Sequence, residues 1–155
     1  MNIEDLKSIM DAFDPASLLP EMEGVLGMLV YAVRLAILAG PLVVLVLGVL
    51  FLVFAPKEAN YYFGYRCAFG MGSVEAWRFA QRLAGITWTA LGLVLSIAMI
   101  LLTGRFDQMD AYDVVWTGAK YILWEVGLVA ASSLFINIAV MRQFTYDGEL
   151  RRDRR

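Results

Sequence analysis

One acidic side chain interrupts a long apolar stretch of this chain, and it is the first candidate for chemistry. Glu125 is the only charged residue within YILWEVGLVAASSLFINIAVM. Ionisable groups inside a membrane are rare and usually have a partner or a function. Arg34 stands at the edge of another apolar stretch, and Asn137 shares the stretch of Glu125. We therefore take Arg34, Glu125 and Asn137 as the intramembrane polar candidates.

Three interpretations of Glu125 are open on the sequence alone. The carboxylate can pair with Arg34, if the first and third apolar stretches are in contact. It can lie at the lipid edge in its neutral form. It can also line a functional site, for an ion, a proton or another ligand. For Asn137 we expect a hydrogen bond between helices, because polar side chains in membranes commonly bond in this way.

Composition excludes most catalytic chemistry. The chain has no histidine and one cysteine, Cys67, which excludes a zinc site of the usual type, a disulfide framework and a histidine-based triad. No nucleophile lies beside a base, and there is neither an acidic cluster for Mg²⁺ nor a glycine-rich phosphate loop. We predict no catalytic residue, no metal and no cofactor. A net charge of −2 also argues against a nucleic-acid partner.

The segment between the first two apolar stretches has the second distinctive pattern. It reads NYYFGYRCAFGMGSVEAWRFAQR from Asn60 onward. Gly64 permits a tight turn or a close backbone approach, and Arg66 offers a planar fork of donors for a carboxylate or phosphate. We expect residues 56–82 to fold into a cap in which Arg66 bonds Asn60, Glu75 or backbone carbonyls. The alternative is that Arg66 only anchors the topology.

Three apolar stretches are the elements that must position these residues. They cover about residues 34–55, 83–104 and 120–141, and each is long enough for the roughly 20 residues that cross a membrane. Unpaired backbone groups are not tolerated in lipid, so the stretches are predicted to be helices. The hydrophobic share of 60 % exceeds the ~45–50 % usual in soluble domains. The predicted fold is an all-α membrane protein with three transmembrane helices.

Charges beside the apolar stretches predict the orientation. Residues 1–33 hold six acidic residues and one basic residue, whereas residues 56–82 hold four basic and two acidic ones. The tail from Arg142 has five arginines and three acidic residues. Basic loops remain in the cytoplasm. We therefore expect the N-terminus outside and both the cap and the C-terminus inside a bacterial cell membrane, with membrane lipids as neighbours.

The chain divides into two unequal parts. Apolar residues recur at helical spacing near the start, so residues 1–21 are predicted to form an extracytoplasmic amphipathic segment. Residues 22–155 are predicted to form a single three-helix membrane domain. Pro41 is expected to kink the first helix. Ser73 is expected to cap a helix that begins at about Val74 and continues into the second span.

The ordered pattern in the cap resembles the SdpI family of small integral membrane proteins, over about residues 45–105. The third span lies outside that resemblance. The pattern departs at Cys67, Ala68 and Gln81, where the family usually has Thr, often Pro and usually Asn. Gly85, beyond the cap, also matches. The cap candidates are Asn60, Gly64, Tyr65, Arg66, Met71, Trp77, Ala80 and Gln81.

The resemblance implies an immunity protein that protects a bacterium from a secreted peptide toxin, and in that case Glu125 can line the site for the toxin. It also implies signalling, through recruitment of a cytosolic repressor to the membrane. The alternative is an accessory or structural subunit that packs on a larger membrane complex or transporter. A transporter formed by this chain alone would require a homo-oligomer, because three helices enclose little volume and no repeated half is visible.

Overall fold

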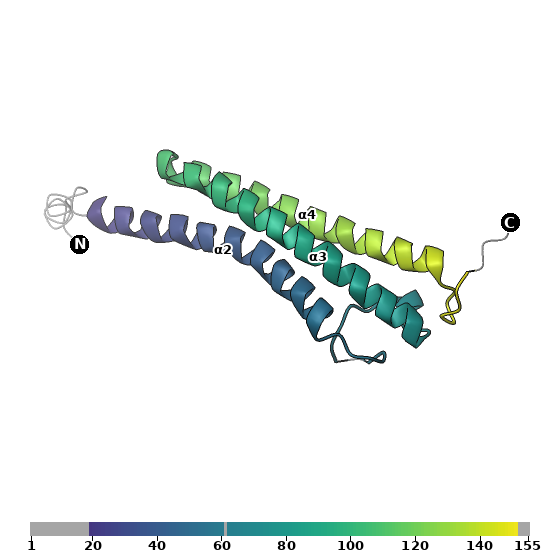
Figure 1. Ribbon diagram of the computed structural model, residues 1–155. Coiled ribbons are helices and arrows are strands. Elements are labelled where there is room, and N and C mark those ends of the chain that lie inside the picture. The colour runs from purple at the N-terminus through teal and green to yellow at the C-terminus, as the bar shows by residue number, and fades with distance from the viewer. Residues whose placement is uncertain (1–18, 61, 152–155) are drawn as a thin grey trace, which may run out of the picture.

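The computed structural model describes residues 19–60 and 62–151. The amphipathic segment expected in residues 1–21 lies almost entirely outside the described residues. The described chain is all-α: three long helices, α2 (Leu19–Val53), α3 (Val74–Thr103) and α4 (Ala111–Gln143), lie side by side (Figure 1). Each is long and apolar enough to cross a membrane. Two short 3₁₀ helices, η2 (Ala68–Gly70) and η3 (Gly104–Gln108), lie in the connections.

The start of α3 follows the sequence prediction closely. Ser73 is the N-cap residue, and its hydroxyl oxygen accepts a hydrogen bond from the backbone N–H of Ala76 at 3.1 Å. Glu75 lies in the first turn, where a negative charge meets the positive end of the helix dipole. The helix then continues without interruption from the cap into the apolar stretch.

The start of α4 differs from the sequence prediction. The third apolar stretch was expected to begin at about residue 120, but α4 begins at Ala111, and η3 fills most of the connection before it. Asp110 is the N-cap residue, and Asp113 lies in the first turn. Acidic residues stabilise the first turn of a helix, so these two charges mark the N-terminus of α4.

Close contact between α2 and α3 depends on glycines. A Cβ atom on Gly92 would lie 2.4 Å from the backbone nitrogen of Leu45, and one on Gly48 would lie 2.3 Å from that of Thr89. Side chains are therefore excluded at both positions, and the two backbones approach as small residues in membrane helices allow. Gly127 in α4, by contrast, has no atom within 4 Å of its ideal Cβ position.

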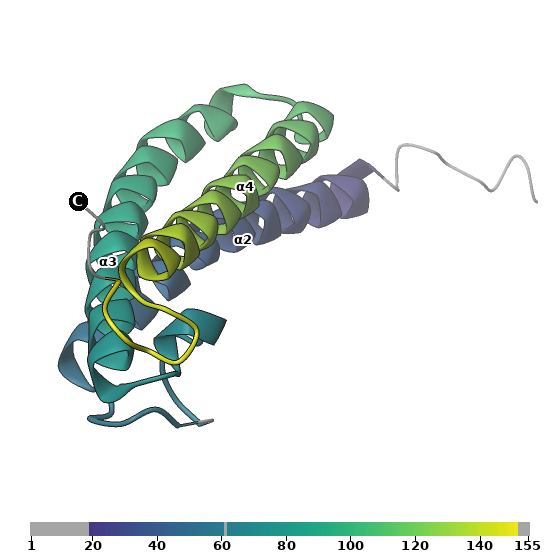
Figure 2. The same ribbon diagram turned by 90° about the vertical axis from the view of Figure 1, so that its right-hand side faces the viewer.

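Buried side chains form two clusters at opposite ends of the bundle. One cluster, beside the cap, includes Phe51, Tyr65 and Ile136. The other, toward η3, includes Ile37 and Phe106. Between these ends α2 bends (Figure 1) while remaining helical through Pro41. The view turned by 90° shows α3 and α4 diverging toward η3 (Figure 2).

Candidate functional site

The cap turns at Gly64, which has a φ of +118°. L-residues with a side chain rarely adopt this conformation. A Cβ atom there would also lie 2.8 Å from both the Gln81 Oε1 atom and the Trp77 ring. The turn therefore requires glycine for its backbone and for its packing, as the close-approach interpretation of the sequence expected.

Gln81 holds the residue that follows this turn. Its Oε1 atom accepts a hydrogen bond from the Tyr65 backbone N–H at 2.8 Å, and its Nε2 group donates to the Tyr65 carbonyl at 2.7 Å. The side chain is only 1 % exposed. A buried amide must satisfy both its donor and its acceptor, and here one backbone residue satisfies both. We call this arrangement the Gln81 clamp.

The Tyr65 side chain joins the cap to the third helix. Its hydroxyl group lies 3.0 Å from the Ser133 carbonyl oxygen and 2.9 Å from the Asn137 Oδ1 atom, both of which can accept its hydrogen. Asn137 thus bonds across elements, as expected for a polar residue in a membrane helix, but its partner comes from the cap. Trp88 in α3 adds a further link, because its indole N–H donates to the Ser132 hydroxyl at 3.1 Å.

Two more contacts close the cap. The Trp77 indole N–H donates to the Pro56 carbonyl at 2.9 Å, which ties the chain leaving α2 to α3. The Ser73 hydroxyl donates to the Gly148 carbonyl at 2.8 Å, which brings the turn after α4 against the start of α3. The cap is consequently fastened to all three long helices.

The other cap candidates take different positions. Asn60 Oδ1 accepts hydrogen bonds from the backbone N–H groups of Tyr62 and Phe63, both at 2.9 Å, and so stabilises its own turn. Ala80 is fully buried, Met71 is partly buried and Arg66 is exposed. The structure therefore brings Gly64, Tyr65, Trp77 and Gln81 together. The hydrogen bonds of the Gln81 clamp involve Tyr65, which directly precedes Arg66 in the sequence, and do not involve Arg66 itself.

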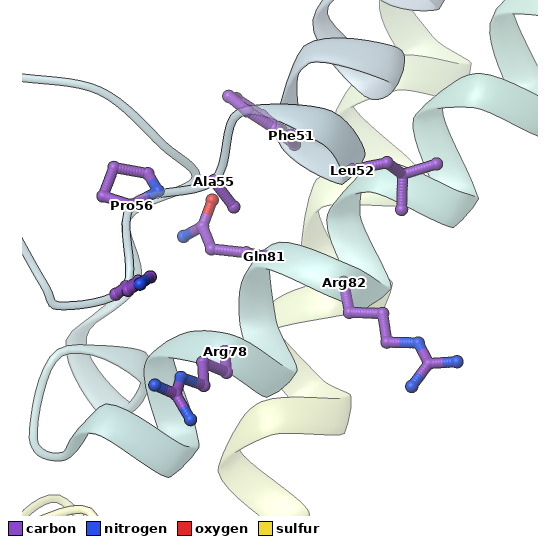
Figure 3. Close-up of a pocket in the computed structure, with 8 residues that line it drawn as sticks. Phe51, Leu52, Ala55, Pro56, Arg78, Gln81 and Arg82 are labelled. Carbon is purple, nitrogen blue, oxygen red and sulfur yellow. The ribbon is translucent and has the colours of Figure 1, made fainter.

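A pocket of about 540 Å³ opens between the end of α2 and the start of α3. Lys57, Arg78 and Arg82 give it a basic rim, and Phe51 and Leu52 give it an apolar wall. Figure 3 shows the side chains of Arg78 and Arg82 pointing in different directions. Because the two guanidinium groups do not converge, the pocket presents diffuse positive charge and no defined anion site.

Arg34 has a different partner from the one considered on the sequence. Its guanidinium forms a salt bridge with Asp107 at 2.5 Å, and its Cζ atom lies 5.9 Å from the centre of the Phe106 ring. The pairing of Arg34 with Glu125 is therefore wrong. The short η3 connection places Asp107 beside α2, within reach of the Arg34 guanidinium.

Glu125 lies deep between the helices, at a groove of about 410 Å³ lined by α2, α3 and α4. We call it the Glu125 groove. Its lining includes Gly40, Pro41, Val44, Leu95 and Val129. The Glu125 side chain is 6 % exposed, and its buried Oε1 atom has no hydrogen-bond partner among the residues that the structure describes. Neither Gly40 nor Asp107 was singled out from the sequence, because only the packing of α2 against its neighbours gives them a role.

Comparison with known proteins gives one match. The family model described as the SdpI/YfhL protein family matches residues 57–141. The match includes the whole cap from residue 57 onward and most of α4, so the third span lies within the family pattern, contrary to the expectation from the motif alone. The bonds from Tyr65 to α4 give a physical reason for the cap and third helix to belong to one pattern. No curated protein and no solved structure matches the chain.

Proposed function

The chain belongs to the SdpI/YfhL protein family, and from this premise we propose that it is a non-enzymatic membrane protein that gives immunity to a secreted peptide toxin. In this proposal the membrane-spanning helices bind the toxin. The cap then signals by holding a cytosolic repressor at the membrane. The proposal extends what the family resemblance implies to the contacts of this particular chain.

The observation that carries the proposal is the fastening of the cap to α4. The Tyr65 hydroxyl reaches Ser133 and Asn137, residues 68 and 72 positions away in the sequence. A change in the packing of the helices would therefore move Tyr65, and the Gln81 clamp would transmit the movement to the rest of the cap. A protein that both binds a toxin and signals requires a connection of this kind.

The orientation completes the proposal. In this proposal the cap and the C-terminal tail lie in the cytoplasm and the N-terminus lies outside, and the excess of basic residues in the cap and tail supports this orientation. The basic rim formed by Lys57, Arg78 and Arg82 would then face the cytosol beside the lipid headgroups. Such a surface suits an acidic partner, because complementary charge steers encounter and orientation.

Survival of a toxin-sensitive bacterium tests this function. Cells that carry the gene or an empty vector are exposed to culture supernatant of a strain that secretes a peptide toxin. We expect survival only with the gene. Tyr65→Phe, which removes the link to α4, should reduce survival, whereas Tyr62→Phe removes a hydroxyl from a side chain that is 98 % exposed and should not.

Two outcomes would contradict the proposal. Equal killing with and without the gene, when the protein is detected in the membrane of the cells that carry it, would rule out immunity. Purification of the protein as a stoichiometric part of a larger membrane complex, together with equal killing, would support the accessory role instead.

A further inference from the structure

We propose that the Glu125 groove is an intramembrane binding site for a small apolar organic cation. This ligand class goes beyond the proposed immunity function and does not depend on it. The proposal rests on a buried carboxyl group without a partner, the space in front of it and the apolar character of the surrounding wall.

The carboxyl group is the first step of the argument. Glu125 is 6 % exposed, and its Oε1 atom is buried without a hydrogen-bond partner in the described residues. A buried charge is strongly unfavourable unless a counter-charge and hydrogen bonds compensate it. Intramembrane acids accordingly pair with one another, with a basic residue or with a ligand.

Two basic residues of the same half of the bundle have other contacts, and a third, Arg105, is exposed on η3. Arg34 is bound to Asp107. The Lys120 Nζ atom lies over the Trp116 ring, 5.7 Å from its centre, on an exposed part of α4. Neither of these two side chains neutralises Glu125 in this structure. A cation that enters the groove would supply the missing charge.

The size and lining of the groove define the body of the ligand. A volume of about 410 Å³ lies within the ~300–1,000 Å³ of small-molecule sites and is too small for a second helix. Apart from the carboxyl group, the lining comes from side chains such as Pro41, Val44, Leu95 and Val129. An apolar body with a single positive charge is the chemistry that matches one carboxylate on an apolar wall.

The α2 side of the groove is built to leave this space. A Cβ atom on Gly40 would lie 2.7 Å from the Glu125 Oε2 atom, so glycine at this position keeps room for the carboxyl group. The next residue, Pro41, has no N–H to donate to the carbonyl oxygen of Ile37 one turn earlier. The helix thus lacks one of its usual internal hydrogen bonds beside the groove.

Binding of a lipophilic cation to the purified full-length protein tests the proposal. Radiolabelled tetraphenylphosphonium is titrated by equilibrium dialysis in detergent, and tetraphenylborate serves as an anion of matched size and shape. We expect saturable binding of the cation only. Glu125→Gln should weaken it by about ten-fold or more, the effect of losing a charged contact. Asp113→Asn, which removes an exposed acid from the same helix, should leave it unchanged.

A second measurement uses the unaltered protein, so it holds even if a variant fails to fold. Dicyclohexylcarbodiimide modifies carboxyl groups in apolar surroundings, and mass spectrometry quantifies the adduct at Glu125. Tetraphenylphosphonium should slow this modification, and tetraphenylborate should not. Equal binding of the two ions, absence of saturable cation binding, or binding retained in a folded Glu125→Gln variant would overturn the proposal. None of these results bears on immunity, which the survival test decides separately.

Discussion

Gln81 in the cap and Glu125 in the groove are two buried polar side chains of nearly equal size in opposite situations. Gln81 is 1 % exposed, and its amide donates to and accepts from the backbone of Tyr65. Glu125 is 6 % exposed, and its Oε1 atom has no partner in the described part of the chain. A buried polar group with its hydrogen bonds made fixes the position of its neighbours. A buried polar group without hydrogen bonds lowers the stability of the fold, so its presence calls for another explanation.

Glycines in the cap, in the α2–α3 contact and in the groove differ in what occupies the space of their missing side chains. At Gly64 and at Gly48 the space of a side chain is filled by neighbouring protein atoms, including the Trp77 ring and the backbone of Thr89. At Gly40 the atom in that space is the carboxyl oxygen of Glu125 itself. Close packing therefore fixes the cap and the α2–α3 contact, while the groove retains volume around its carboxyl group.

Exchange of amide and carboxyl groups at positions 81 and 125 should give the largest difference in the free energy of unfolding between the two sites. Gln81→Glu replaces the donor to the Tyr65 carbonyl by a second acceptor and buries a charge, so we expect a loss of about 4 kcal/mol in the free energy of unfolding. Glu125→Gln removes a charge that has no partner, so we expect no loss of stability. Unfolding in dodecyl sulfate, followed by circular dichroism, measures both. Equal losses of stability at the two sites would contradict the difference between a satisfied Gln81 and an unsatisfied Glu125.

Gly64→Ala should be the next most damaging change. The substitution places a Cβ atom at a φ of +118° and against Gln81 and Trp77, and strain with overpacking together should cost about 3 kcal/mol. Gly127→Ala is the matched control, because no atom lies within 4 Å of that position. The same unfolding assay applies. A Gly64→Ala protein as stable as the control would show that the turn can rearrange.

Tyr65→Phe should have a moderate effect. It removes the hydroxyl that bonds the Ser133 carbonyl and the Asn137 amide oxygen, and we expect a loss of about 1 kcal/mol in the free energy of unfolding. Tyr62→Phe should be neutral because that side chain is 98 % exposed. Hydrogen exchange at the backbone of residues 64–66 should also increase in the first variant only. Unchanged exchange would mean that the cap does not need its link to α4.

The ion pair of Arg34 and Asp107 should contribute less. Its side chains are 29 % and 74 % exposed, so a double-mutant cycle with Arg34→Gln and Asp107→Asn should give a coupling of about 0.5 kcal/mol. The same cycle with Arg34→Gln and Glu125→Gln should give additive effects. A larger coupling in the second cycle would restore the Arg34–Glu125 pair.

Cys67 should have the smallest effect of all on stability. Burial raises the pKa of its thiol, which lowers the thiolate fraction at neutral pH, and the thiolate is the species that reacts. Alkylation by iodoacetamide at pH 7 should therefore be slower in the folded protein than in the unfolded chain, and it should accelerate as the pH rises. Cys67→Ser should unfold like the unaltered protein. Equal alkylation rates for folded and unfolded protein would contradict the protection by burial.

Local patterns predicted much of the fold. The length of the apolar stretches, the Ser73 cap and the continuity of the second helix follow from residues near one another in sequence, and the structure confirms all three. The start of α4 at Ala111 was missed, because acidic residues suit a loop and a helix N-terminus equally well. The pattern in the cap also identified the family, but it could not show that the third helix belongs to the same pattern.

The sequence by itself determined the membrane class, the helical fold and the position of the cap between the first two spans, since these depend on hydropathy and on short-range spacing. Tertiary structure alone decided which polar group meets which partner. Gln81 meets the Tyr65 backbone, Arg34 meets Asp107, and Glu125 meets no partner among the described residues. Hydrogen bonds and ion pairs depend on distances of a few ångströms between segments, and those distances are fixed only when the helices pack.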